Sequence, residues 1–543
     1  MKLPKFSEFT LRIRVIIFLL ASITLLLSCQ NEKNIQFDIL IMNGKIIDGS
    51  GSPAIKADIG IKAEKILKIG NLKGYKADTI IDAANLIVTP GFIDIHTHCD
   101  WGIDQKETRA NLNYLIQGVT SVATGNCGYG TYEITKFQEK LDNSGIGTNV
   151  IPLTGLGLIR NKVMGMENRN PEPQEILEMK ELLKQAMEEG SWGLTTGLQY
   201  VPGKYASTEE ITEISKVAVP YDGIYSTHMR SEEEDLIEAV NEAIEIGKES
   251  GINVNISHLK ANGKSNWPFM KKVIEIVNKA REDGMTVTAD MYPYDKSATT
   301  ALYSVLLYPK DYNGIEEIQK VLSNPIERKA IKDLTESGIP GQVNWVAKGG
   351  WNFFSIIKVP GHPELTNKMF CDLAKESGKS EFDVAADLII EAGEDVIISL
   401  STMNEENLVL QLQQPWIMVS SDGSAINFGA KGVHPRNYGS NARVLRKYVK
   451  EENILAMEEA VRRMSGLAAE TMGLNDRGLL KQGYFADIAI FDYSKIYDRA
   501  TFLDPNHYSE GVEYVIVNGK ISIKNGEFID QYNGKVLLKN EQK

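Results

Sequence analysis

The stretch PGFIDIHTHCD, residues 90–100, is a strand-like apolar run that ends in two histidines, a cysteine and an aspartate. His96 and His98 are two residues apart, so on a strand their side chains point the same way and can bind one metal ion. Cys99 points to the opposite side and is expected to be structural, and Asp100 is expected to be a structural partner near the site. The stretch therefore predicts a buried strand that carries two candidate metal ligands at its carboxyl end.

Seven further strand-like runs follow, and most are separated by amphipathic stretches with helical periodicity. They are VTSVATGNC, NVIPLTGLG, WGLTTGL, GIYSTHMR, INVNISHLK, MTVTADMYPY and PWIMVSSDG. Eight β-then-α units favour an α/β fold with a (β/α)8 TIM-like barrel over residues 90–476, with an open doubly wound sheet as the alternative. The wide gap before the last run predicts an insertion or lid within residues 295–410.

Two β-rich segments flank this central region. Residues 37–89 and 477–543 both contain short alternating runs punctuated by Asn-Gly, Asp-Gly and Gly turns. Each segment is too small to bury its own core, so we expect the two to pair in one small β-sandwich beside the central region.

The first residues of the chain resemble the export signal of a bacterial lipoprotein. A basic start precedes an apolar run over residues 15–27, which is too short for a membrane span of about 20 residues. The run ends in Leu26-Leu27-Ser28-Cys29, which resembles a lipobox. The pattern predicts a signal peptide over residues 1–28, lipidation of Cys29, a polar tether over residues 29–36, and anchoring at the periplasmic side or cell surface. An uncleaved signal anchor is the alternative.

Composition narrows the class of protein. The 543 residues are 43% hydrophobic and 24% charged, which is typical of a globular protein. The net charge of −13 argues against nucleic acid as a partner, and the membrane is expected to be contacted only through the lipid anchor. Without Cys29 the chain keeps Cys99, Cys127 and Cys371, an odd number that makes a disulfide framework a poor explanation. Cys371 lies in a helix-like run and is expected in the core.

Strand ends hold most of the residues that can bind metal. Four of the seven histidines follow strand-like runs, together with one cysteine and one aspartate. A single histidine in such a place is more often a hydrogen-bonded structural residue, but convergent strand ends would bring the whole set to one face. Nitrogen, sulfur and oxygen donors together suit zinc better than magnesium or calcium. The candidate ligands are His96, His98, Cys127, His228, His258 and Asp422.

An ordered series of motifs resembles the D-aminoacylase (N-acyl-D-amino-acid deacylase) family of the amidohydrolase superfamily. The series covers nearly the whole chain after Cys29 and comprises MNGKIIDGSG, PGFIDIHTHCD, GVTSVATGNCG, GLTTGLQYVPGKYA, YSTHMRSE, ISHLKANG, DMYPY, SSDG, HPRNYG, DRGLLKQGYFADIAIFD and VIVNGK. The resemblance implies zinc-dependent hydrolysis of N-acyl-D-amino acids, which releases a carboxylate and a D-amino acid.

The same resemblance assigns roles to individual residues. It implies one metal position held by His96, His98 and Asp422 and another held by Cys127, His228 and His258, with one or two zinc ions. Asp422 would be both ligand and general base. Lys260 would receive the substrate carboxylate, Tyr292 and Arg436 would be further substrate contacts, and Tyr200 would assist at the carbonyl.

The sequence departs from the family pattern at two places, so more than one class of amide substrate fits it. Leu156 stands where the family usually has histidine, and Asp295-Lys296-Ser297 replaces a run of small and hydroxylic residues. Hydrolysis of a D-dipeptide or of a cyclic amide therefore remains an alternative. A surface lipoprotein that binds zinc without turnover is an alternative of a different class, and the sequence makes no prediction of the oligomeric state.

Overall fold

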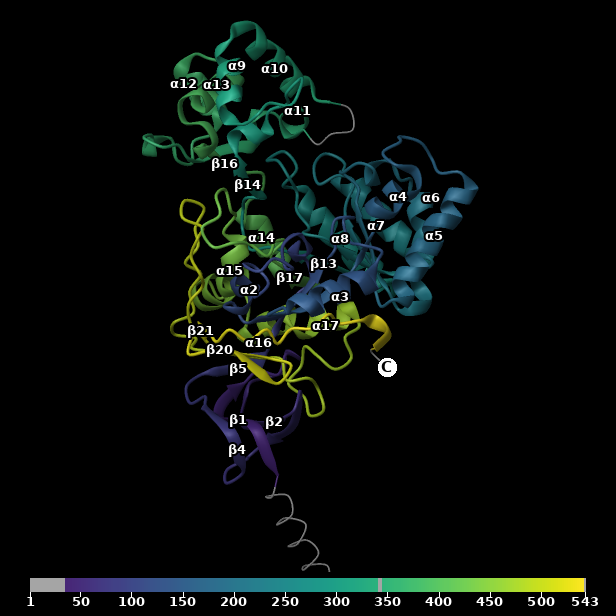
Figure 1. The fold of residues 1–543 in the computed structure, drawn as a ribbon, viewed down its shortest axis with the longest axis vertical. Coiled ribbons are helices and arrows are strands. Elements are labelled where there is room, and N and C mark those ends of the chain that lie inside the picture. The colour runs from purple at the N-terminus through teal and green to yellow at the C-terminus, as the bar shows by residue number, and fades with distance from the viewer. Residues whose placement is uncertain (1–34, 340–343, 542–543) are drawn as a thin grey trace, which may run out of the picture.

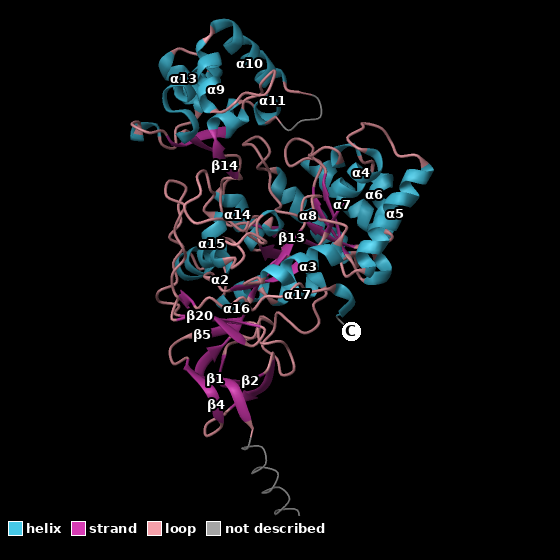
Figure 2. Cartoon of the chain, viewed as in Figure 1, coloured by secondary structure: helices cyan, strands magenta, loops and turns pink. Residues whose placement is uncertain are grey.

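The computed structural model describes residues 35–339 and 344–541 of the chain, so the predicted signal peptide and Cys29 lie outside the described residues. Figure 1 shows three parts, which are a β-rich end at the bottom, a mixed body in the middle and a mainly helical lobe at the top. Among the described helices none is both long enough and apolar enough to cross a membrane. The fold is α/β, with strands concentrated in the β-rich end and inside the body (Figure 2).

The β-rich end is one nine-stranded sheet built from both ends of the described chain. Strand β5 pairs antiparallel with β18, so that Thr89 lies opposite Ala489. Isoleucine side chains from both segments share one hydrophobic cluster, which neither segment could form alone. The strands are β1 (Gln36–Ile46), β2 (Ile55–Lys62), β3 (Lys65–Gly70), β4 (Lys76–Asp82), β5 (Ile87–Pro90), β18 (Ile488–Phe491), β19 (Val512–Val517), β20 (Lys520–Lys524) and β21 (Glu527–Phe528).

The strands of the body are short, parallel and buried. They form a three-stranded sheet in the order β6-β7-β8 and a six-stranded sheet in the order β9-β10-β11-β12-β13-β17. A parallel bridge between Thr97 and Gly423 links the end of β6 to the end of β17. The strands are β6 (Phe92–Asp94), β7 (Val119–Thr124), β8 (Asn149–Pro152), β9 (Thr154–Gly155), β10 (Gly193–Gly197), β11 (Ile224–His228), β12 (Asn253–Ile256), β13 (Val287–Met291) and β17 (Ile417–Val419).

Helices of the body follow the strands and pack on them through apolar side chains. Helix α5 begins at Pro173 behind a capping box of Glu172 and Glu175, and α7 ends at Gly251, whose φ of 80° suits a glycine cap. The helices are α2 (Leu112–Leu115), α3 (Ile134–Ser144), α4 (Leu156–Met164), α5 (Pro173–Glu188), α6 (Thr208–Ser215), α7 (Leu236–Ser250), α8 (Phe269–Glu282), α14 (Glu405–Leu412), α15 (Arg436–Arg443), α16 (Met457–Met464) and α17 (Gly466–Met472).

The lobe at the top of Figure 1 is formed by residues 298–400 and has a hydrophobic cluster of its own. A three-stranded antiparallel sheet in the order β14-β16-β15 connects it to the body. This segment lies inside the range predicted to contain an insertion. Its elements are β14 (Ala298–Ala301), α9 (Ile315–Ser323), α10 (Pro325–Ser337), α11 (Trp345–Gly349), β15 (Phe354–Lys358), α12 (Phe370–Ser377), α13 (Glu381–Ala392) and β16 (Ile397–Leu400).

The last described residues leave the β-rich end and lie against the body. Val536 forms a parallel bridge with Val150 of β8, and the Trp192 indole donates to the Leu537 carbonyl over 2.6 Å. The segment predicted as the second part of the sandwich therefore ends in contact with the body rather than with the β-rich sheet.

Candidate metal centre

All six predicted metal ligands lie together at the carboxyl ends of the body strands. They form three overlapping groups, and within each group the ligand atoms lie within 4.8 Å of one another. Active sites of parallel α/β folds occupy this end of the strands. The groups are His96 with His98 and Cys127, Cys127 with His228 and His258, and His96 with His258 and Asp422.

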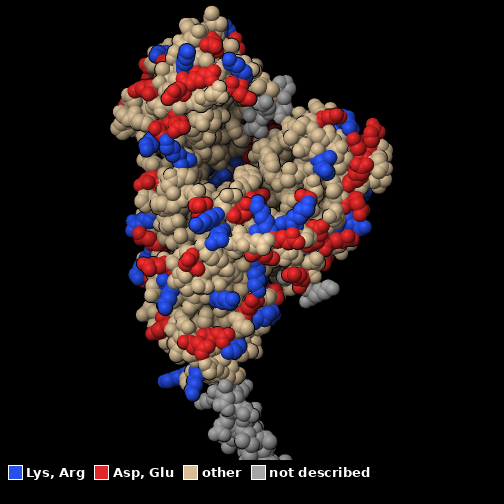
Figure 3. All heavy atoms as spheres, in the orientation of Figure 1, with Lys and Arg blue, Asp and Glu red and all other residues tan. Residues whose placement is uncertain are grey.

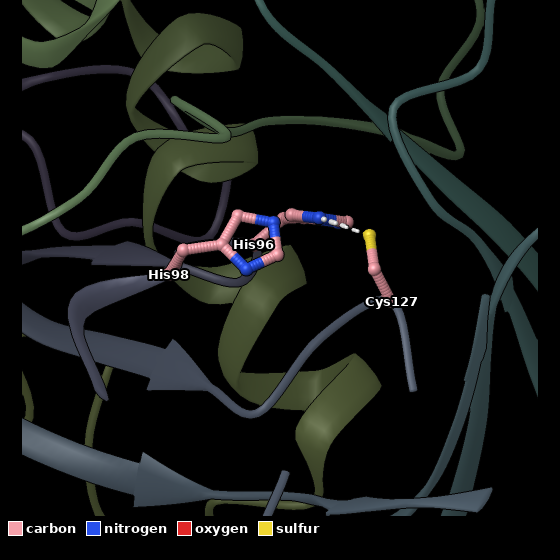
Figure 4. A group of neighbouring side chains, drawn as sticks. All are labelled: His96, His98 and Cys127. Carbon is pink, nitrogen blue, oxygen red and sulfur yellow. Dashed lines mark hydrogen bonds between the residues drawn. The ribbon is translucent and has the colours of Figure 1, made fainter. Parts of the chain in front are cut away.

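The Cys127 sulfur is shared by three histidines. It lies 3.5 Å from His96 Nε2, 3.5 Å from His258 Nε2 and 3.8 Å from His228 Nδ1. Figure 4 shows the contact between His96 and the sulfur, with the His98 ring beside His96. Burial alone would raise the pKa of the Cys127 thiol, but the charge of His96 and the three hydrogen bonds bring it well below its usual value. These contacts favour the thiolate, which is the form that binds metal.

Asp422 provides a second anion at the same centre. Its Oδ1 lies 3.2 Å from His98 Nε2 and 3.5 Å from His96 Nε2. Its Oδ2 forms an ion pair with Arg436 Nη1 at 2.8 Å. Burial would raise the pKa of the carboxyl group, but Arg436 and the histidines hold it well below its usual value. An ionised carboxylate in this position can bind a cation and can accept a proton.

Three of the six residues hold an unusual backbone conformation. The φ angles are 54° at Cys127, 35° at His258 and 49° at Asp422, a region that residues other than glycine rarely adopt. Each such residue costs on the order of 1 kcal/mol or more and persists only where the surroundings impose it. Strain at three of six convergent side chains indicates a functional centre rather than ordinary core packing.

The chemistry of these donors fits a zinc ion. The centre combines a thiolate, a carboxylate and four imidazoles, a set that suits zinc better than calcium or magnesium. Three ring nitrogens, His96 Nδ1, His98 Nδ1 and His228 Nε2, are buried and have no hydrogen-bond partner among the described residues, and in each ring the other nitrogen faces Cys127 or Asp422. The nitrogens that face the centre converge with the Cys127 sulfur and the Asp422 carboxylate, and two anions surrounded by imidazoles form a site for a cation.

Two buried acids behind the centre do not appear among the residues predicted from sequence. Glu232 Oε1 lies 3.0 Å from His258 Nδ1 and accepts from Lys260 Nζ over 2.6 Å. Asp290 Oδ1 accepts from the His258 backbone N over 2.9 Å and lies 3.5 Å from His96 Nδ1. Glu232 therefore orients the His258 imidazole so that its Nε2 is available to a metal, whereas Asp290 holds the His258 backbone and is the nearest charge to His96 Nδ1.

We expect Glu232→Gln to weaken zinc binding by about 10- to 100-fold, because the carboxylate fixes the orientation and basicity of His258. A zinc competition titration with a chromophoric chelator measures the effect. Glu210→Gln is a matched control, since Glu210 is equally buried but pairs with Arg160 at 3.0 Å, away from the predicted ligands. Equal zinc affinity in both variants would show that Glu232 does not support His258.

A cavity of 280 Å³ opens at the centre, and all four predicted substrate contacts line it. Arg436 and Lys260 lie 4.8 Å and 5.7 Å from the centroid of the Tyr292 ring, so both cations lie within cation–π distance of the same aromatic ring. The Tyr200 ring lies 4.8 Å from the His228 ring. In Figure 3 the surface is hollowed between the lobe and the body. Five predicted ligands also line the cavity, namely His98, Cys127, His228, His258 and Asp422.

The two departures from the family pattern, Leu156 and residues 295–297, lie in different parts of the structure. Leu156 is fully buried in the main hydrophobic cluster and does not line the cavity. Ser297 does line it. Lys296 donates to Ser355 and Ser401 over 3.1 Å and 3.0 Å, which ties the start of the lobe to its own sheet. The second departure therefore alters the cavity rim, whereas the first alters the core.

The remaining residues singled out from sequence lie outside the centre. Cys99 is buried beside Asn111, and burial raises the pKa of its thiol to about 12, which fits a structural role. Asp100 accepts from the Thr124 hydroxyl and backbone hydrogen bonds, also a structural arrangement. Cys371, expected in the core, is instead half-exposed on α12, because it follows the buried Phe370 on the outer side of a short helix.

Comparison with known proteins agrees with this geometry. The model of the amidohydrolase family matches residues 420–523, which include Asp422 and Arg436. D-aminoacylase from Alcaligenes xylosoxydans xylosoxydans is 31% identical over 93% of this chain and 98% of its own length. N-acyl-D-glutamate deacylase from the same organism is 30% identical over 89% of this chain and 93% of its own length.

A solved structure extends the similarity to three dimensions. N-acyl-D-glutamate deacylase from Bordetella bronchiseptica, complexed with zinc and a phosphonate mimic of the tetrahedral intermediate, superposes with a TM-score of 0.75. The two are 29% identical, and the match covers 93% of this chain and 100% of that one. This chain belongs to the D-aminoacylase family of the amidohydrolase superfamily.

Proposed function

We propose that this protein hydrolyses the amide bond of N-acyl-D-amino acids with zinc as cofactor. The observation that carries the proposal is the position of ionised Asp422, which lies among the predicted zinc ligands and lines the same cavity as Lys260 and Arg436. A site that only stores zinc has no need of a cavity lined by two cations. Three relatives at about 30% identity are deacylases of N-acyl-D-amino acids.

A zinc ion, when bound, supplies Lewis acidity that acidifies water and polarises a carbonyl group. His96, His98, Cys127, His228, His258 and Asp422 would hold one or two such ions. In the reaction, Asp422 accepts the proton of the attacking water at a carboxylate oxygen and delivers it to the leaving nitrogen. The Tyr200 hydroxyl donates to the oxyanion, and burial keeps that hydroxyl protonated because it raises the pKa of Tyr200.

The cations position the substrate and distinguish its two enantiomers. Lys260 and Arg436 line the cavity beside Tyr292, so an α-carboxylate can bind to these cations while the amide lies over the metal ligands. With carboxylate and amide both fixed, only one configuration at the α-carbon directs the side chain into the free part of the cavity. We therefore propose that these three residues select the D enantiomer.

A substrate panel tests the proposed function. The zinc-loaded protein should release free amino acid from N-acetyl-D-amino acids and not from their L enantiomers. D-dipeptides, cyclic amides and amides without an α-carboxylate complete the panel. Faster turnover of a D-dipeptide or a cyclic amide than of every N-acetyl-D-amino acid would contradict the proposal.

Lys260→Met should raise KM for an N-acetyl-D-amino acid by about 10- to 100-fold, since a charge-assisted hydrogen bond contributes about 1.5–3 kcal/mol. Steady-state kinetics at full zinc loading measure the effect, because Lys260 also contacts His258 at 2.7 Å. An N-acetylated amine without the carboxylate serves as the internal control, and its much weaker turnover should change little. A similar loss on both substrates would remove the carboxylate role of Lys260.

We also propose the finer architecture expected from sequence. The Thr97–Gly423 bridge supports closure of the body strands into one (β/α)8 barrel over residues 90–476. The sheet shared by residues 37–89 and 477–543 would be the small sandwich, and the lobe within residues 295–410 would be an insertion that acts as a lid. A crystal structure with substrate analogue and zinc tests each of these assignments.

Export and lipid anchoring at Cys29 are a further part of the proposal, supported by the sequence pattern alone. Metabolic labelling with a radioactive fatty acid in a bacterial host should label the full chain. Cys29→Ala should abolish the label and release the protein from the membrane fraction. A labelled Cys29→Ala protein would contradict this assignment.

A further inference from the structure

Aromatic side chains form one continuous wall of the cavity. We name Trp101, Tyr129 and Tyr200 the aromatic wall. Trp101 stacks on His98 with ring centroids 4.5 Å apart and an interplanar angle of 21°, and it meets Tyr129 edge-on at 5.8 Å. Tyr129 lies 5.7 Å from Tyr200, which in turn lies 4.8 Å from His228. The wall thus begins and ends on predicted metal ligands.

The outer part of this wall is exposed although it lines the cavity. Trp101 is 61% exposed and Tyr129 is 37% exposed. Exposure of large aromatic rings to water is unfavourable. An exposed pair of such rings beside a cavity therefore indicates a surface to which an apolar group of a ligand binds. Stacking on His98 already fixes the Trp101 ring, so little side-chain freedom would be lost on binding.

The wall and the cations occupy different strands of the body. Trp101, Tyr129 and Tyr200 follow β6, β7 and β10, whereas Lys260, Tyr292 and Arg436 follow β12, β13 and β17. In the described residues no ring contact joins the wall to Tyr292. The cavity therefore has one side that carries two ion-paired cations and another that is aromatic and uncharged, and His98 and Asp422 lie between Trp101 and Arg436.

An N-acyl-D-amino acid has the same polarity along its length. Its carboxylate is on one side of the amide and its acyl group is on the other. If the carboxylate binds at Lys260 and Arg436, with the amide over the metal ligands, the acyl group extends towards Trp101 and Tyr129. An uncharged aromatic surface favours an apolar acyl group over a charged one.

We propose that the aromatic wall is the acyl-group subsite and selects substrates whose acyl group is apolar and larger than acetyl, namely aromatic or medium-chain aliphatic. The inference rests on the proposed deacylase function and adds the class of acyl group to it. Each acyl methylene that becomes buried on the wall raises kcat/KM by about fourfold, until the chain extends beyond Trp101.

The test measures kcat/KM for N-acetyl-, N-butyryl-, N-hexanoyl- and N-phenylacetyl-D-leucine on the zinc-loaded full chain. We expect the hexanoyl and phenylacetyl substrates to exceed the acetyl substrate. Trp101→Ala should lower the hexanoyl-to-acetyl ratio by about 3- to 10-fold. Zinc content is measured for each variant because Trp101 stacks on His98. Tyr129→Ala provides an independent variant, since the Tyr129 ring contacts only Trp101 and Tyr200 among the ring pairs of the described chain.

Phe428→Ala is the matched control, because Phe428 is a comparably exposed aromatic residue that does not line this cavity. Its hexanoyl-to-acetyl ratio should equal that of the wild type. Turnover of N-acetyl-D-leucine with a flat acyl series, and ratios unaffected by Trp101→Ala and Tyr129→Ala, would overturn the subsite while leaving the deacylase function in place. Failure to hydrolyse any of the four substrates would instead overturn the proposed function. If the effect of Trp101→Ala and Tyr129→Ala on kcat/KM depends on the amino-acid side chain and not on the acyl chain, the aromatic wall binds the side chain and the acyl-group assignment is wrong.

Discussion

Asp422→Asn should lower kcat by about 100- to 10,000-fold while zinc remains bound, since loss of a general acid–base group has an effect of this size. Asparagine keeps the shape and one oxygen of the side chain but cannot accept the proton of water. The remaining histidines and Cys127 continue to hold the metal. Steady-state kinetics together with zinc analysis of the same sample measure both quantities.

Asp498→Asn is a matched control for this variant. Asp498 is also buried, and it pairs with Arg443 and Arg446 rather than with a predicted ligand. We expect Asp498→Asn to lower the melting temperature with a much smaller effect on kcat. Near wild-type turnover by zinc-loaded Asp422→Asn would show that Asp422 is not the base.

Cys127→Ala should lower zinc affinity by at least about 100-fold and should lower activity with it. Loss of a residue that only hydrogen-bonds to a metal ligand already costs up to about 100-fold, and loss of a ligand should cost at least as much. The sulfur contacts three histidines at 3.5–3.8 Å, so its removal leaves a gap at the middle of the donor set. Zinc titration followed by intrinsic fluorescence or calorimetry measures the affinity, and activity is assayed in the same buffer.

Cys99→Ala provides the comparison for that experiment. Cys99 is equally buried, but its sulfur contacts Asn111 and no histidine. Its removal should leave zinc affinity and turnover close to the wild type. If Cys127→Ala and Cys99→Ala bind zinc equally well, Cys127 is not a ligand and the donor set is wrong.

The residues of the metal centre could be predicted because each one follows or ends a strand-like run, and the carboxyl ends of these strands meet at one face. His96 and His98 are two apart on an apolar run, and such a run is buried on both faces in a parallel sheet. Asp422 and His258 follow equally clear runs. The predicted strand direction set Cys99 aside and left Cys127, which follows another strand-like run, as the sulfur ligand. The structure shows the physical difference, which is three histidine neighbours against one asparagine.

The supporting residues could not be predicted in the same way. Glu232 lies in the acidic run SEEED, which reads as a solvated surface, yet it is 2% exposed because Lys260 and His258 approach it from the next strand. Asp290 lies two residues before Tyr292 and shares its side of β13, a signal that could have identified it. Trp101 gives no periodic signal, because it ends a three-residue 3₁₀ helix after β6.

We propose that zinc and the residues of this cavity together hydrolyse N-acyl-D-amino acids. Incubation of the purified full chain with racemic N-acetyl-leucine, followed by chiral chromatography of the released leucine, tests it most directly. We expect release of D-leucine only, with loss of turnover after chelation and recovery on addition of zinc. Release of L-leucine at an equal rate, or turnover that persists without metal, would contradict it.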